Sequence, residues 1–200
     1  MIPQKMMRIG LYGGTFDPPH WAHLKLAEWV YQCLDLECIY FIPAAIHAFK
    51  ANKNISSADL RFDLVQAATR TYPHFRVSRI ELDRPGTSYT IDTLHDFISF
   101  EHLKQSELFY IIGSDNLTDF RCWKNPDQIL DLATLVVLRR AGGTDKNLPE
   151  HKNIVYLKSP VIDMSATEIR KKVKNGQDIS SLVPAAVNAL IRKFHLYQSP

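Results

Sequence analysis

Two stretches of the chain are apolar at almost every position, and they limit the possible folds more than any other feature. They are Leu108–Ile112 and Leu132–Leu138. A strand with one face in water alternates apolar and polar residues, so an unbroken apolar run is typical of a strand covered on both faces. Strands of this kind belong to parallel sheets, whose two faces are covered by helices.

Other predicted strands and helices alternate along the chain. Short apolar or alternating runs predict strands over residues 8–12, 38–42, 75–82 and 154–157. Apolar residues at helical spacing predict helices over residues 20–34, 58–72, 90–103, 165–175 and 182–196. Because the connections are short, the pattern indicates an α/β fold, a Rossmann-like doubly wound parallel sheet with helices on both faces.

The length of 200 residues suits a single domain, residues 1–200, in which 158–200 form a small C-terminal helical portion. Hydrophobic residues make up 46% and charged residues 22%, which excludes a disordered or fibrous chain. The mean hydropathy is −0.17, and no uncharged apolar run approaches the roughly 18 residues of a membrane span. Residues 141–152 are polar and contain Gly142, Gly143 and Pro149, so we expect a mobile loop there.

Charge and cysteine content indicate the setting. The net charge of +3 suits anionic small molecules and is too small to require nucleic acid. Cys33, Cys38 and Cys122 form no Cys-x-x-Cys pair, so we interpret them as buried, reduced thiols. No apolar segment precedes the charges near the N-terminus, and we therefore expect a cytoplasmic protein without a secretory signal.

The segment 13–24 is the strongest candidate for a binding site. It reads GGTFDPPHWAHL, follows the first predicted strand and opens the first predicted helix, which is where open α/β sheets bind ligands. Gly13 and Gly14 allow the backbone to approach a phosphate closely. His20 and His23 share one face of the first helical turn, beside its positive end, and can donate hydrogen bonds to phosphoryl oxygens. A metal site is less favoured, because no third ligand stands nearby.

Three further segments carry weaker signals. Ser165 and Glu168 form a capping box, which starts a helix whatever the function, and Arg170 follows one turn later. Free amides, hydroxyls and this guanidinium could together hold an anion. The segments 113–116 and 85–90 read as turns after or before regular elements, and Trp123 is either core or a stacking surface. Lys50 and Arg139 are single basic residues, and each could either bind a ligand or simply be solvated.

Taken together, the segments resemble the nucleotidyltransferases of the His-x-Gly-His type and, among them, the nicotinate-nucleotide adenylyltransferases. The resemblance extends over almost the whole chain from Arg8. It rests on GGTFDPPHWAHL at 13–24, SYTIDTL at 88–94, IIGSDNL at 111–117 with Trp123, LVVLRRAG at 135–142 and MSATEIR at 164–170. The chain departs from the usual pattern where Ala22 stands for Gly, Phe49 for His, Arg140 for Pro and Ala166 for Ser.

The resemblance implies a late step of NAD synthesis, in which ATP and nicotinate mononucleotide give deamido-NAD and pyrophosphate. Its catalytic residues would be His20, His23, Lys50 and Arg170. ATP would contact Gly13, Gly14, Thr15, Phe16, His20, His23, Gly113, Asp115, Ser165, Thr167 and Arg170. Nicotinate mononucleotide would contact Thr15, Lys50, Ser88, Tyr89, Thr90, Trp123 and Arg139.

The resemblance further implies that Mg²⁺ arrives with ATP and that the protein supplies no metal ligands of its own. Asp17 or Asp115 would orient groups around the metal or the ribose. Two alternatives remain: a related adenylyl- or cytidylyltransferase that takes phosphopantetheine or nicotinamide mononucleotide, and a non-catalytic nucleotide sensor. We expect no nucleic-acid or membrane partner, and either a monomer or a homo-oligomer.

Overall fold

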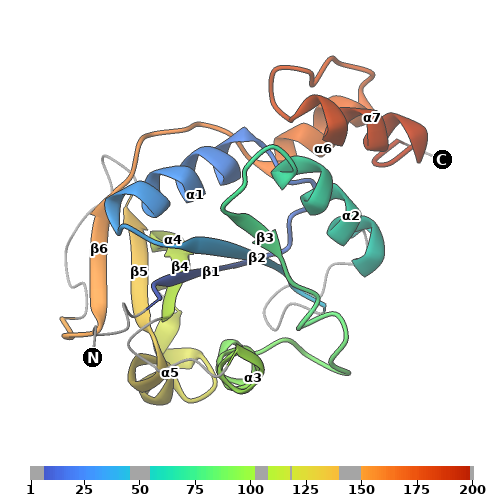
Figure 1. Ribbon diagram of the computed structural model, residues 1–200. Helices are drawn as coiled ribbons and strands as arrows, with labels where there is room; N and C mark the ends of the chain where they lie inside the picture. The colour runs from blue at the N-terminus through green and yellow to red at the C-terminus, as the bar shows by residue number, and fades with distance from the viewer. Residues whose placement is uncertain (1–6, 46–54, 102–107, 118, 140–149, 199–200) are drawn as a thin grey trace.

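A computed structural model describes residues 7–45, 55–101, 108–117, 119–139 and 150–198. Its centre is a six-stranded sheet in the order β3-β2-β1-β4-β5-β6, in which every neighbouring pair is parallel. Figure 1 shows helices on both sides of this sheet. The predicted fold class, a Rossmann-like doubly wound sheet, is therefore confirmed.

The strands and helices alternate as the sequence predicts. The strands are β1 (Ile9–Gly14), β2 (Cys38–Pro43), β3 (Phe75–Val77), β4 (Leu108–Gly113), β5 (Thr134–Arg139) and β6 (Ile154–Lys158). The helices are α1 (Trp21–Cys33), α2 (Ala58–Thr69), α3 (Thr90–Glu101), α4 (Ser114–Leu117), the 3-10 helix η2 (Phe120–Cys122), α5 (Pro126–Leu132), α6 (Ala166–Lys174) and α7 (Ala185–Lys193).

The strand order reverses at β1, which pairs with β2 on one side and β4 on the other. Ile9 is in register with both Cys38 and Leu108. The connection that follows β1 contains α1, on one face of the sheet, and the connection that follows β4 contains α5, on the other face. A crevice therefore opens beyond the carboxyl ends of β1 and β4. Gly13, Gly14 and Gly113 end these two strands and therefore lie at the crevice.

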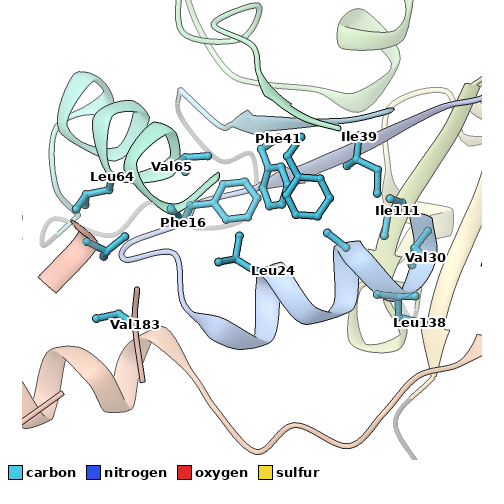
Figure 2. Packing of buried hydrophobic residues seen from close by; sticks show 14 of the residues in the cluster. Phe16, Leu24, Val30, Ile39, Phe41, Leu64, Val65, Ile111, Leu138 and Val183 are labelled. Carbon is cyan, nitrogen blue, oxygen red and sulfur yellow. The ribbon is translucent and has the colours of Figure 1, made fainter. Parts of the chain in front are cut away.

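Each central strand buries both of its faces. In β4, Leu108, Tyr110 and Ile112 pack on the side of α3 and α5, whereas Phe109 and Ile111 pack on the side of α1 and α2. Figure 2 shows the second core, where Phe41 of β2 and Ile111 of β4 face Leu24 and Val30 of α1. The period-two arrangement explains why these strands are apolar at every position.

The C-terminal helical portion shares this second core. Val183, Val187 and Ile191 are buried within it, and α7 packs against α2. Figure 1 shows α6 and α7 together at one end of the molecule, beside α2. Among the described residues, no helix combines the length and the apolar character needed to cross a membrane.

Several details differ from the sequence predictions, among them the short helix α4, which stands where the sequence reads as a turn. The strand predicted over 75–82 ends at Val77, because the backbone forms a turn closed by the Asp83 N–H on the Arg79 carbonyl. Helix α5 was not predicted; it takes up Leu132, which we assigned to a strand. Cys33 and Cys122 are exposed, and only Cys38 is buried. Cys33 is the last residue of α1 and Cys122 closes η2, so neither points into a core.

Candidate active site

The loop between β1 and α1 forms the base of the site. A Cβ atom at Gly13 would lie 2.6 Å from the Tyr110 hydroxyl, and one at Gly14 would lie 2.9 Å from the Phe16 ring. Both positions therefore require glycine for close packing. Phe16 adopts a positive φ of 50°, and its buried ring lies under Tyr12 and His23 at centroid distances of 5.7 and 5.1 Å.

A cavity of about 480 Å³ extends from this loop toward the start of α6. Its lining contains most of the residues predicted to contact ATP: Gly13, Gly14, Thr15, Phe16, His20, His23, Gly113, Ser165, Thr167 and Arg170. The structure thus brings together segments from the beginning and the end of the chain. We refer to this space as the larger cavity.

His20 and His23 stack on each other at the start of α1, with ring centroids 3.8 Å apart. The Nδ1 atom of His23 accepts the backbone N–H of His20 at 3.2 Å, so a neutral His23 carries its proton on Nε2. The Nδ1 atom of His20 is buried without a hydrogen-bond partner among the described residues. Burial lowers the pKa of His20 to about 4, and burial together with His20 lowers the pKa of His23 well below its usual value. Both rings are therefore neutral near pH 7.

The first two turns of α6 supply hydroxyl and guanidinium groups to the same cavity. Ser165 is the N-cap, and its Oγ accepts the Glu168 N–H at 3.2 Å, which confirms the Ser165 half of the predicted capping box. Arg170 donates to the Asp17 carbonyl at 2.7 Å and to Thr167 Oγ1 at 3.2 Å. These bonds fix the guanidinium beside the loop that carries His20 while leaving other N–H groups for an anion.

A smaller cavity of about 230 Å³ shares Gly13 with the larger one. Ser88, Tyr89, Thr90 and Trp123 line it, as predicted for the mononucleotide. Helix α3 begins at Thr90, so the first backbone N–H groups of that helix have no partner within it. The cavity thus combines an aromatic wall with a helix N-terminus, which suits a ring bearing an anionic substituent.

Neighbouring aromatic rings and an adjacent ion pair hold Trp123 in this wall. Its ring is 6.4 Å from Tyr110 in an edge-to-face arrangement and 5.5 Å from Phe120. The adjacent Lys124 forms an ion pair with Asp92 of α3 at 2.9 Å and lies 5.0 Å from the Tyr89 ring centre. The loop carrying Trp123 is therefore fastened to the start of α3.

The two cavities meet over a common floor. Gly13, Gly14, Ile112 and Asn116 line both of them. A ligand in one cavity can therefore come directly against a ligand in the other, above the carboxyl ends of β1 and β4.

Some residues predicted for the site lie elsewhere or outside the described residues. Arg139 lines neither cavity; its guanidinium lies 5.9 Å from the Tyr156 ring centre. Thr15 lines the larger cavity, although we predicted contacts with both substrates. Lys50 lies outside the described residues, and Asp115 is in α4 without a described side chain.

Sequence reasoning missed two buried charged groups beside the cavities. Arg61 of α2 is 2% exposed and donates to the backbone carbonyls of Ser56, Thr15 and Ala45. Glu81 is 4% exposed and lines the smaller cavity. Arg61 looks like a surface residue of an amphipathic helix, and Glu81 lies in a segment that we predicted to be a strand. No local signal marks either of them.

Asp17 serves as a structural link in this site. One carboxylate oxygen accepts the Ser56 N–H at 3.1 Å, and the other accepts the Tyr197 hydroxyl at 2.6 Å. Within the described part of the chain, no group of three or more His, Cys, Asp or Glu side chains could hold a metal ion.

This fold and the paired cavities define a nucleotide-binding protein of the Rossmann-like α/β class, and comparisons with known proteins specify the family. The cytidylyltransferase-like family model matches residues 11–172. The chain is 38% identical over 199 residues to a Dehalococcoides mccartyi protein named "Probable nicotinate-nucleotide adenylyltransferase", covering 96% of this chain and 97% of that protein. A Thermus thermophilus protein of the same name is 39% identical over 192 residues, with 96% and 100% covered. The chain belongs to the cytidylyltransferase-like family and, within it, to the nicotinate-nucleotide adenylyltransferases.

Solved structures share the fold. A Plasmodium falciparum nicotinic acid mononucleotide adenylyltransferase complexed with NaAD superposes with a TM-score of 0.75 at 16% identity, covering 96% of this chain and 97% of that one. The same enzyme complexed with APC gives a TM-score of 0.73 at 15% identity and the same coverage.

Proposed function

We propose that this protein transfers the AMP moiety of ATP to nicotinate mononucleotide, giving deamido-NAD and pyrophosphate, in NAD biosynthesis. The observation that carries this proposal is the pair of cavities with a common floor at Gly13, Gly14 and Asn116. The larger cavity holds groups that bind phosphates, and the smaller one holds an aromatic wall and a helix N-terminus. The names of the two bacterial relatives support the same reaction.

In the proposed reaction, a phosphate oxygen of the mononucleotide attacks the α-phosphorus of ATP. A new P–O bond forms, and the bond from the α-phosphorus to the bridging oxygen of the β-phosphate breaks. The nucleophile is a phosphate monoester with a second pKa of about 6, so it is largely dianionic at pH 7 and needs no general base. The protein therefore acts by positioning and by stabilising charge.

Particular residues of the larger cavity perform these roles in our proposal. His20 and His23 are neutral hydrogen-bond donors to the α-phosphoryl oxygens, because burial keeps them unprotonated before ATP binds. Arg170, Ser165 and Thr167 hold the β- and γ-phosphates at the start of α6. Mg²⁺ enters as part of the MgATP substrate, and it supplies positive charge to the leaving pyrophosphate.

The proposal is tested by product analysis with the purified protein and Mg²⁺. ATP and CTP are each combined with nicotinate mononucleotide and with phosphopantetheine, and products are identified by mass spectrometry. We expect deamido-NAD from ATP and nicotinate mononucleotide, with at least about tenfold less from every other pair. Preferred use of CTP or phosphopantetheine would identify a related transferase instead. Binding of ATP without any product would indicate a nucleotide sensor.

A further inference from the structure

Glu81 is a buried carboxyl group to which the proposed reaction assigns no role. It lies in the segment between β3 and α3, is 4% exposed and lines the smaller cavity. A cavity that accepts an anionic ring gains nothing in affinity from a second carboxyl group. A structural or positioning role must therefore explain its place in the wall.

The Thr93 hydroxyl of α3 points its proton at Glu81. Thr93 Oγ1 lies 2.7 Å from Glu81 Oε1 and accepts an N–H of Arg84 at 3.0 Å, so its own proton is available for Glu81. Thr93 also contacts the turn before it, because its N–H donates to the Tyr89 carbonyl at 3.1 Å and its Oγ1 lies 3.2 Å from the same oxygen. Ser88, the residue before Tyr89, accepts the Ala45 N–H at 3.1 Å with its Oγ.

These contacts connect Glu81 to the turn that precedes α3. The connection runs from Glu81 through Thr93 to the Tyr89 carbonyl. Ser88 ties the same turn to Ala45, whose carbonyl in turn accepts Arg61 of α2. The turn containing Ser88 and Tyr89 is thus held by two other segments, and the backbone N–H groups that begin at Thr90 are its donors for a ligand.

The charged groups around Glu81 come from several elements. Burial raises its pKa, whereas the Thr93 and Ser88 hydroxyls and the charges of Arg84 and Arg61 lower it. Tyr110 of β4 also faces it, and the Glu81 charge contributes to the raised pKa of that phenol. One oxygen of Glu81 accepts the Thr93 hydroxyl in either protonation state, so the role argued here does not depend on its titration.

We propose that Glu81 is a positioning residue that orients the Ser88–Thr90 turn, and that it thereby sets the affinity for the mononucleotide and the preference for an acid over an amide. This inference rests on the proposed function. It assigns specificity to a residue that need not touch the substrate, acting through Thr93 and the N–H groups of α3.

The test compares Glu81→Ala and Glu81→Gln, with Asp17→Asn as the matched control. Asp17 is an equally buried carboxyl group, but its partners lie beside the larger cavity. We expect Glu81→Ala to raise the KM for nicotinate mononucleotide about tenfold, with the KM for ATP changed less than about twofold. Glu81→Gln keeps one acceptor oxygen and should recover most of this loss. Asp17→Asn should instead raise the KM for ATP.

Two further measurements separate positioning from simple stabilisation. The ratio of kcat/KM for the acid and amide mononucleotides should fall in Glu81→Ala and be restored in Glu81→Gln. In a double-mutant cycle, Glu81→Ala should add little to Thr93→Val, because both break one connection. If Glu81→Ala does not fold, Glu81→Gln and Thr93→Val carry the comparison through calorimetric binding of nicotinate mononucleotide, which Thr93→Val should weaken.

Equal increases in both KM values, or an unchanged acid-to-amide ratio in a folded Glu81→Ala protein, would overturn the inference. A lowered Tm without any change in KM would reduce Glu81 to a fold-stabilising residue. Failure of the wild-type protein to use nicotinate mononucleotide would overturn the proposed function itself, so the two failures are distinguishable.

Discussion

At the scale of single residues, the paired imidazoles at the start of α1 combine burial with an unmet hydrogen-bonding need. His20 is 4% exposed, and its Nδ1 atom has no partner among the described residues. A buried nitrogen of this kind costs free energy. His20 also lines the larger cavity, where its ring can contact a phosphoryl oxygen.

Replacing either histidine should remove transition-state stabilisation. We expect His20→Ala and His23→Ala each to lower kcat about 100-fold or more, by analogy with the loss of one oxyanion donor. Steady-state kinetics measure the effect, and circular dichroism with thermal melting serves as the control for folding. Near-normal kcat in a folded variant would remove the histidines from the mechanism.

The same burial predicts how stability depends on pH. His20 has a pKa of about 4 in the folded protein and about 6.5 when unfolded, so only the unfolded state takes up the proton between these values. The free energy of unfolding should therefore decrease as the pH falls from about 6.5 to 4, by about 3 kcal/mol from this residue.

Urea unfolding at several pH values measures this loss. His20→Asn should lose less stability over the interval than the wild type. Replacement of the exposed His95 serves as the matched control and should leave the dependence unchanged. An identical acid-induced loss in His20→Asn would show that His20 does not carry it.

At the scale of elements, helix starts are arranged around the two cavities. The first two turns of α6 face the larger cavity with Ser165, Thr167 and Arg170, and the first turn of α3 faces the smaller one at Thr90. Both places favour negative charge, because the leading N–H groups of a helix lack intrahelical partners. In the proposed complex, α6 serves the phosphates and α3 serves the carboxylate of the pyridine ring.

The start of α3 predicts a preference for the acid mononucleotide over the amide. Backbone N–H groups satisfy both oxygens of a carboxylate but leave an amide NH₂ against other donors. Charge-assisted hydrogen bonds contribute about 1.5–3 kcal/mol, so we expect roughly 10- to 1000-fold discrimination in kcat/KM. Parallel kinetics with nicotinate and nicotinamide mononucleotides measure the ratio. Comparable values would point to a dual-specificity enzyme with an acceptor in that cavity.

Most elements could be predicted from the sequence because their signals are local. The apolar runs of β4 and β5 follow directly from burial on both faces, and Ser165 with Glu168 marks the start of α6. The strand predicted over 75–82 was too long. Only Phe75–Val77 pairs with β2, and the length of a strand depends on the strand beside it. Helix α5 is short, and its C-terminal residues resemble the start of the strand that follows.

At the scale of the whole molecule, the loop that carries the histidines is fixed by segments distant in sequence. Arg61 of α2 binds the Thr15 carbonyl, Arg170 of α6 binds the Asp17 carbonyl, and Tyr197 near the end of the chain binds the Asp17 carboxylate. Periodicity and motif spacing carry no information on such contacts. The histidines and glycines of the site could therefore be predicted. The roles of Arg61, Glu81 and the Asp17 carboxylate could not.

The arrangement of two cavities above one floor makes a direct transfer the central claim. Gly13 and Asn116 line both cavities, so two ligands bound there would meet directly. One displacement at the α-phosphorus would then suffice, with the attacking and leaving oxygens in line. The most direct test is the stereochemical course of the reaction with ATP made chiral by sulfur at the α-phosphorus. A single in-line displacement predicts inversion of configuration in the dinucleotide product. Retention would mean two displacements through a covalent nucleotidyl-enzyme, and it would contradict direct transfer between the cavities.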